Sequence, residues 1–196
     1  TAGASDEMAR QMTNNYEATR LYGVELKEMS AVMTKLKSTY TDFTMLNKDA
    51  QDEIAKTGAL LAEVGVSNED FAKSMQTSTK AFGLTGPAAA GAARDIADFA
   101  NVIGVIPSEL GADFAAMGGG LAKMGDQGIR AFKDLAIASK TTGLEMKKIL
   151  AITDKFDTFE GAAEQAGKLN AALGGNFVNA MDLMMATDPA ERFDMI

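Results

Sequence analysis

The sequence predicts an all-α fold, with a long N-terminal coiled-coil helix followed by a bundle or array of short helices. Three observations predict it. Alanine, the strongest helix former, is abundant, whereas β-branched residues are few. Residues 8–43 carry an uninterrupted heptad pattern, and from Gly65 onward glycines recur about every 20 residues. We therefore divide the chain into residues 1–47, a coiled-coil helix; 48–64, a connecting helix; 65–188, short helices in hairpins; and 189–196, the start of a further helix.

The heptad pattern advances in alternating steps of four and three residues. A strict period of this kind favours a coiled coil, because a straight helix drifts by about 20° per heptad from a 3.5-residue repeat. The alternative is one long amphipathic helix that lies on a core. We expect the seam to be an oligomer interface, with Asn15 and Thr19 fixing its register. The seam residues are Met8, Met12, Asn15, Thr19, Tyr22, Leu26, Met29, Met33, Leu36, Tyr40 and Phe43.

Glycines interrupt the remainder of the chain, and each precedes an amphipathic segment of about 12–16 residues. Alternate glycines of this series, Gly65, Gly104 and Gly143, are 39 residues apart, which is typical of a degenerate helical-hairpin repeat. The expected helix-break glycines are Gly65, Gly83, Gly104, Gly125 and Gly143. Near the end, Asp188, Pro189 and Glu191 form a helix-start signal only a few residues before the sequence stops. We expect the chain to be a segment of a longer protein.

The composition excludes several kinds of chemistry. The chain has no cysteine and no histidine, so it has no disulfide, thiolate nucleophile or histidine relay. Its net charge of −8 argues against general binding to phosphate backbones. The glycine-rich run that begins at Gly118 has Asp126 where a phosphate-binding loop needs lysine. We expect no cofactor, no specific nucleic-acid binding and no enzymatic activity.

An acidic trio and a long uncharged run are weaker patterns in the sequence. Asp154, Asp157 and Glu160 follow each other at three-residue spacing, so they could share a helical face that binds a divalent ion. Their spacing does not match a calcium-binding loop, and solvated acids are common on helices, so we expect no metal or catalytic site.

The longest uncharged run, Leu169 to Met181, has 13 residues. A bilayer needs about 20, which leaves only conditional membrane insertion open.

Residues 158–176 read TFEGAAEQAGKLNAALGGN, and the sequence continues through Asp182-Leu183-Met184 to a DPAERF motif at residues 188–193. This stretch resembles tail tape measure proteins of tailed bacteriophages, especially contractile-tailed ones. The Gly-Val-Ser-x-Glu-Asp-Phe and Gly-Leu-Thr-Gly segments before it are also similar to that family. The resemblance covers residues 65–196.

The resemblance implies a structural virion protein. Such a chain templates tail length, lies in the interior of the tail tube or tail tip as a trimer or hexamer, and leaves at infection to assist genome passage. Its implied partners are itself, the tail-tip or baseplate hub, the tube proteins and, transiently, a host membrane. Its implied location is the virion tail, and the host cytoplasm during assembly. We expect residues 65–196 to be a folded region near one end of the tape. The alternative function is a secreted, membrane-active helical translocator or pore former.

Overall fold

A computed structural model describes residues 2–196, and all regular secondary structure in this range is helical. The chain forms two compact units, one ending at Asp126 and the other beginning at Gln127. The first contains α1 (Ala2–Thr19), η1 (Arg20–Tyr22), α2 (Leu26–Thr39), η2 (Phe43–Met45), α3 (Lys48–Glu63), α4 (Asn68–Lys80), α5 (Gly86–Ile103) and α6 (Pro107–Leu121). The short helix η3 (Ala122–Gln127) spans the boundary. The second contains α7 (Gly128–Thr142), α8 (Met146–Thr153), η4 (Asp154–Phe156), α9 (Phe159–Leu173), α10 (Ala180–Met185) and α11 (Pro189–Asp194).

The long N-terminal coiled-coil helix is not present, because the predicted helix is broken at Gly23. This residue has a φ of 95°, in the left-handed region that glycine alone enters at little cost. The chain then buries Val24 and restarts as α2, where the side chain of Glu28 accepts a hydrogen bond from the backbone N–H of Glu25. A continuous helix leaves its apolar stripe in water unless another chain covers it. Reversal at Gly23 lets α1 and α2 cover much of the stripe within one chain.

A repeated motif begins each of the helices α2, α4, α6 and α8. The motif is a glycine followed by valine or leucine, and the helix starts three residues after the glycine. Successive glycines are 42, 39 and 39 residues apart, at Gly23, Gly65, Gly104 and Gly143. The sixth residue after each glycine is almost fully buried; these residues are Met29, Phe71, Leu110 and Ile149. The 39-residue period predicted from the glycines therefore corresponds to a structural repeat that also includes Gly23.

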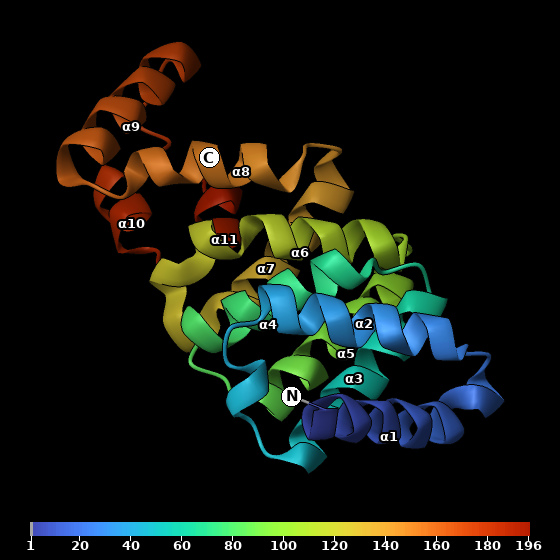
Figure 1. The fold of residues 1–196 in the computed structure, drawn as a ribbon. Coiled ribbons are helices and arrows are strands. Elements are labelled where there is room, and N and C mark those ends of the chain that lie inside the picture. The colour runs from blue at the N-terminus through green and yellow to red at the C-terminus, as the bar shows by residue number, and fades with distance from the viewer. Residues whose placement is uncertain (1) are drawn as a thin grey trace. The chain divides into compact units, whose positions relative to one another are not determined.

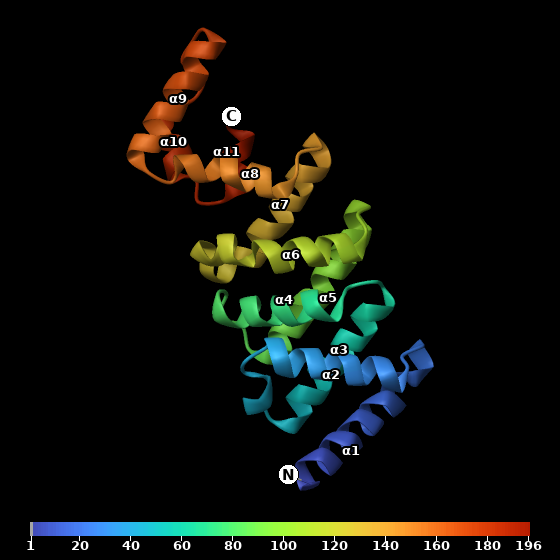
Figure 2. The same ribbon diagram turned by 45° about the horizontal axis from the view of Figure 1, so that its top comes forward.

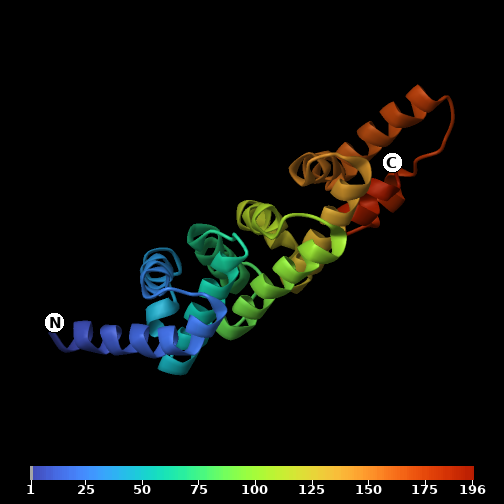
Figure 3. The same cartoon turned by 90° about the vertical axis from the view of Figure 1, so that its right-hand side faces the viewer.

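Within the first unit the helices form two layers. Helices α2, α4 and α6 lie side by side in one layer, and α3 packs beside α5 in the other (Figures 1 and 2). Helix α1 packs on both α2 and α3, so it covers the first hairpin (Figure 3). The core between the layers is apolar and includes Met33, Leu36, Ile54 and Met75, each fully buried. The range predicted as a connecting helix is thus α3, a member of this core.

Small residues allow these helices to approach closely. A Cβ atom added at Gly58 of α3 would lie 2.6 Å from the ring of Phe71 and 2.8 Å from Val32. At Gly118 of α6 it would lie 2.1 Å from the Cγ2 atom of Thr77 in α4. All three distances are far below van der Waals contact, so α3 and α6 need glycine at these positions to pack on their neighbours.

The second unit contains two smaller assemblies of helices. Helices α7, α8 and α11 pack together, and α9 packs along α10. Phe156, Ala162, Ala166, Val178 and Leu183 form the apolar core around η4, α9 and α10. Asp188 caps α11 by accepting hydrogen bonds from the backbone N–H groups of Ala190 and Glu191, at 2.7 and 3.3 Å. The helix start expected at this point is therefore present.

Neighbouring glycines in α6 allow a direct test of the close packing. We expect Gly118→Ala to lower the free energy of unfolding by about 1–3 kcal/mol, because the β-branched Thr77 has few rotamers with which to avoid the new methyl group. Gly119→Ala is the matched control. A Cβ there meets nothing within 4 Å, so replacing a helical glycine should stabilise by about 0.5–1 kcal/mol. Urea unfolding followed by circular dichroism measures both; equal effects of the two substitutions would contradict the packing described.

Candidate interaction surfaces

The structure places most of the predicted seam residues inside the monomer. Met8 and Met12 are half-buried against the core of the first unit, whereas Tyr22 and Leu26, on either side of the Gly23 turn, are exposed. The remaining seam residues are buried: Asn15, Thr19, Met29, Met33, Leu36, Tyr40 and Phe43. The heptad pattern therefore identified buried positions, but in this structure the covering surface belongs to the same chain.

The polar seam residue Asn15 is bound within the chain. Its Nδ2 donates to Oδ1 of Asp52 in α3 at 2.9 Å, and Nε2 of Gln11 donates to the same oxygen at 3.2 Å. Thr19 donates its hydroxyl hydrogen to the carbonyl oxygen of Asn15 at 2.8 Å. The hydrogen bond from Asn15 to Asp52 thus holds α1 against α3. Asn15 was expected to fix the register between copies of one helix, whereas here its partner lies in the same chain.

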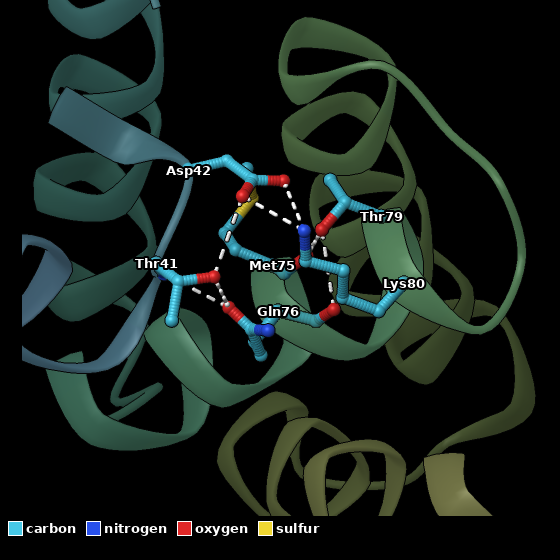
Figure 4. Close-up of polar contacts among 6 residues, drawn as sticks. All are labelled: Thr41, Asp42, Met75, Gln76, Thr79 and Lys80. Carbon is cyan, nitrogen blue, oxygen red and sulfur yellow. Dashed lines mark hydrogen bonds and ion pairs between the residues drawn. The ribbon is translucent and has the colours of Figure 1, made fainter. Parts of the chain in front are cut away.

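A polar network joins the end of α2 to the end of α4 (Figure 4). The Nζ of Lys80 donates to both carboxylate oxygens of Asp42, at 2.8 and 2.7 Å. The backbone N–H and the hydroxyl of Thr41 donate to Oε1 of Gln76, at 2.9 and 3.1 Å. Beside this network, burial raises the pKa of the Tyr40 phenol. The network links the turn after α2 to the last turns of α4, and its polar side chains are hydrogen-bonded to each other.

The five glycines predicted to break helices all have positive φ values. These are 90° at Gly65, 69° at Gly83, 67° at Gly104, 54° at Gly125 and 74° at Gly143. Gly65, Gly104 and Gly143 lie in the turns that follow α3, α5 and α7. Two further glycines behave in the same way, Gly23 and Gly174, and spacing alone did not single them out.

The acidic residues considered as a metal or catalytic group do not share a helical face. Asp154 begins η4, Asp157 follows its end, and Glu160 lies in the first turn of α9. The chain turns between them, so the three-residue spacing does not correspond to one helix. Asp157 instead accepts a hydrogen bond from Nη1 of Arg192 at 2.5 Å.

Arg192 connects distant parts of the second unit. Its side chain is 7% exposed. Nη1 also donates to the carbonyl oxygen of Thr153 at 2.7 Å, and Nη2 donates to that of Ala186 at 2.7 Å. The guanidinium therefore ties α11 to the end of α8 and to the segment after α10. Sequence reasoning missed this residue, because its partners lie up to 39 positions away.

A second side chain, Asn170, shapes the segment between α9 and α10. Its Oδ1 accepts from the backbone N–H groups of Phe177 and Val178, at 2.9 and 2.8 Å, and its Nδ2 donates to the carbonyl oxygen of Val178 at 2.8 Å. The amide thus fixes a turn that glycines alone would leave loose. Large apolar side chains of α9, α10 and the segment between them remain between 51% and 72% exposed: Phe159, Leu173, Phe177, Met181 and Met185.

One cavity among the described residues of the first unit is small. A cavity lined by Leu61, Phe71, Ile96 and Phe114 has a volume of about 10 Å³, room for no more than a single water. Within residues 2–196, the acidic side chains include no group of three or more placed to hold a metal ion. In the same range, each helix is too short or too polar to cross a membrane.

Comparison with protein-family models, with curated proteins and with solved structures found no match.

Removal of the Arg192 guanidinium should loosen the contact between α8 and α11. We expect Arg192→Met to lower the free energy of unfolding by about 2–3 kcal/mol, because two buried carbonyl groups and the half-exposed Asp157 lose their donor. Arg130→Met is the matched control, since Arg130 pairs with Asp134 on the surface and such pairs contribute about 0.5 kcal/mol or less. Hydrogen exchange should accelerate at the amides of α8 and α11 in the first variant alone. Unchanged exchange there would show that Arg192 does not hold these helices.

Proposed function

We propose that this chain is a structural component of a phage tail, a folded segment of a tail tape measure protein, and that it performs no catalysis. The observation that carries the proposal is the resemblance of residues 158–193 to that family, together with what those residues do in the fold. The stretch that carries the resemblance forms α9, α10 and α11, one continuous part of the second unit.

The residues of this stretch have structural roles. Thr158 caps α9 by accepting a hydrogen bond from the N–H of Gly161 at 3.1 Å, and Gly174 ends the helix with a φ of 75°. Asn170 fixes the following turn, Asp188 caps α11, and Arg192 ties α11 to α8. Side chains that are engaged in holding a fold support a structural protein better than an enzyme.

The folded form limits what this segment measures. A ruler needs a constant rise per residue, which a continuous helix provides at about 1.5 Å. The longest helices here have 18 residues, and consecutive helices of the first unit fold back on each other. We therefore assign the segment to a docked region near one end of the tape, against the tail-tip or baseplate hub and the tube proteins, rather than to the part that sets tail length.

The heptad seam adds a second state to this proposal. The stripe that is buried within the monomer by the turn at Gly23 is a coiled-coil seam when residues 8–43 are one helix. A trimer or hexamer of such helices buries the same side chains between copies. We assign the folded form to the docked segment and the coiled-coil form to the tape as it lies in, or passes through, the tube.

A secreted membrane-active protein is the second candidate. The exposed Phe177 before α10, and Met181 and Met185 within it, favour this candidate, because such side chains insert readily into a lipid surface. Leakage of dye from lipid vesicles at neutral pH, caused by purified chain that does not self-associate, would favour this candidate over the tail protein.

The location of the chain in the particle tests the main proposal. We expect mass spectrometry of purified tails to find its peptides at a small, fixed copy number. We also expect the chain to resist protease in intact tails and to be cleaved after DNA ejection is triggered. An exterior tail subunit, cleaved equally in both states, is the control. Absence of the chain from tails, or cleavage of it in intact tails at the rate of the exterior subunit, would contradict the proposal.

A further inference from the structure

Exposed apolar side chains recur at the turns that lead into α2, α4 and α6. Each turn contains one of the repeat glycines, Gly23, Gly65 or Gly104, and the apolar residues lie within three positions of it. Their exposed fractions range from 48% to 88%. We call this set the apolar edge; it consists of Leu21, Tyr22, Leu26, Val64, Val102 and Ile106.

The three turns are neighbours in space. A Cβ atom at Gly23, in the first turn, would lie 3.3 Å from Oε2 of Glu63 at the end of α3. A Cβ at Gly65, in the second turn, would lie 3.4 Å from the Cβ of Ser108 at the start of α6. Figure 2 shows the three turns following one another along the same side of the first unit. The apolar edge therefore places exposed apolar residues at each of three turns that follow one another along one side of the first unit.

The opposite side of the first unit is built differently. There the turns from α2 to α3 and from α4 to α5 are joined by the ion pair of Asp42 with Lys80 and by the bond from Thr41 to Gln76. Phe82, in the second of these turns, is 4% exposed. Met45 is the one large hydrophobic residue of the two turns that is strongly exposed. The difference indicates that exposure at the apolar edge is not a general property of turns in this fold.

An exposed carboxylate lies near each turn of the apolar edge, whereas the basic side chains are confined to the first turn. Glu25 lies in the first turn, Glu63 ends the helix before the second, and Glu109 lies in the first turn of α6, after the third; all three are exposed. The basic side chains Arg20 and Lys27 lie at the first turn. An apolar row bordered by carboxylates at every repeat complements an apolar surface with basic flanks. A second copy paired in parallel along the same edge would bring its carboxylates against these carboxylates, which disfavours that pairing.

We propose that the apolar edge binds a basic amphipathic α-helix of another protein. Neighbouring packed helices are about 8–10 Å apart, so the repeat places apolar groups at about that interval. Seven residues of an α-helix rise about 10.5 Å, so apolar side chains one heptad apart meet successive positions of the row. The partner helix therefore has one apolar residue per heptad facing the edge, with lysine or arginine on both flanks. This inference goes beyond the proposed function and does not depend on it.

Binding of a synthetic helix to the full chain tests the proposal. The probe is a fluorescent helix of about three heptads, with leucine at one position per heptad and lysine on both flanks. The altered chain carries Val64→Thr and Val102→Thr, which keep side-chain shape but remove the apolar surface, and Met45→Thr on the opposite side is the matched control. Fluorescence anisotropy should give about tenfold weaker binding for the double variant and unchanged binding for the control.

Three results would overturn the proposal. The first is equal affinity of the original chain and the double variant, with circular dichroism showing that both are folded. The second is equally tight binding of a probe in which glutamate replaces every lysine. The third is self-association of the chain alone, seen by analytical ultracentrifugation and abolished in the double variant, because the apolar edge would then be occupied by a second copy. All three results are measured on the purified chain, so they do not depend on whether the chain is found in a phage tail.

Discussion

In the first unit, the turns before α2, α4, α5 and α6 each contain a glycine in the left-handed region, and the burial of the apolar stripes depends on those turns. The helices are 13 to 18 residues long, a length at which an isolated helix is only marginally stable in water. They persist because each one reverses and packs its stripe against its neighbours. Gly23 is the clearest case, since it divides a heptad stripe that a straight helix could bury only against another chain. The same device at Gly65 and Gly104 generates the layered array and places a turn of similar sequence at each repeat.

The burial pattern was more predictable from the sequence than the identity of the covering surface. Periodicity correctly marked Met29, Met33 and Leu36 as buried, because spacing reports which side of a helix avoids water. It does not report what covers that side, and the structure does not show the continuous coiled-coil helix that the spacing predicted. The signal that was missed was local: a glycine followed by Val24 and the Glu25–Glu28 pair, in the pattern seen again at Gly65.

Long-range polar contacts were not predictable in the same way. Arg192 is an arginine in a short helix, and nothing in its neighbourhood indicates that its guanidinium reaches the carbonyl of Thr153. Asp157 looked like part of an acidic group because its spacing was read on one helix, whereas the chain turns at η4. Asn170 was likewise inconspicuous, although it shapes the turn before α10. Such contacts depend on how helices meet, which no local pattern contains.

The two ways of burying the heptad stripe connect the fold with the proposed role. A tail component that is docked in one state and threaded in another needs a surface that can be covered by its own chain or by other copies. Methionines at Met29 and Met33 suit this requirement, because their flexible, unbranched side chains adapt to different neighbours. The apolar edge shares Tyr22 and Leu26 with this stripe, but both are exposed in the folded form, so the edge remains available to a partner while the core is closed.

The distance between Met8 and Lys37 tests the central claim, that the heptad stripe folds back on itself at Gly23. In the structure Nζ of Lys37 lies 3.1 Å from the sulfur of Met8, whereas one continuous helix would separate these residues by about 44 Å. The chain has no cysteine, so spin labels on Ala9→Cys and Ser38→Cys are unique and report this geometry by electron double resonance. The account predicts a distance of about half the continuous-helix value or less for the purified chain. A single distribution centred on the continuous-helix value would contradict it.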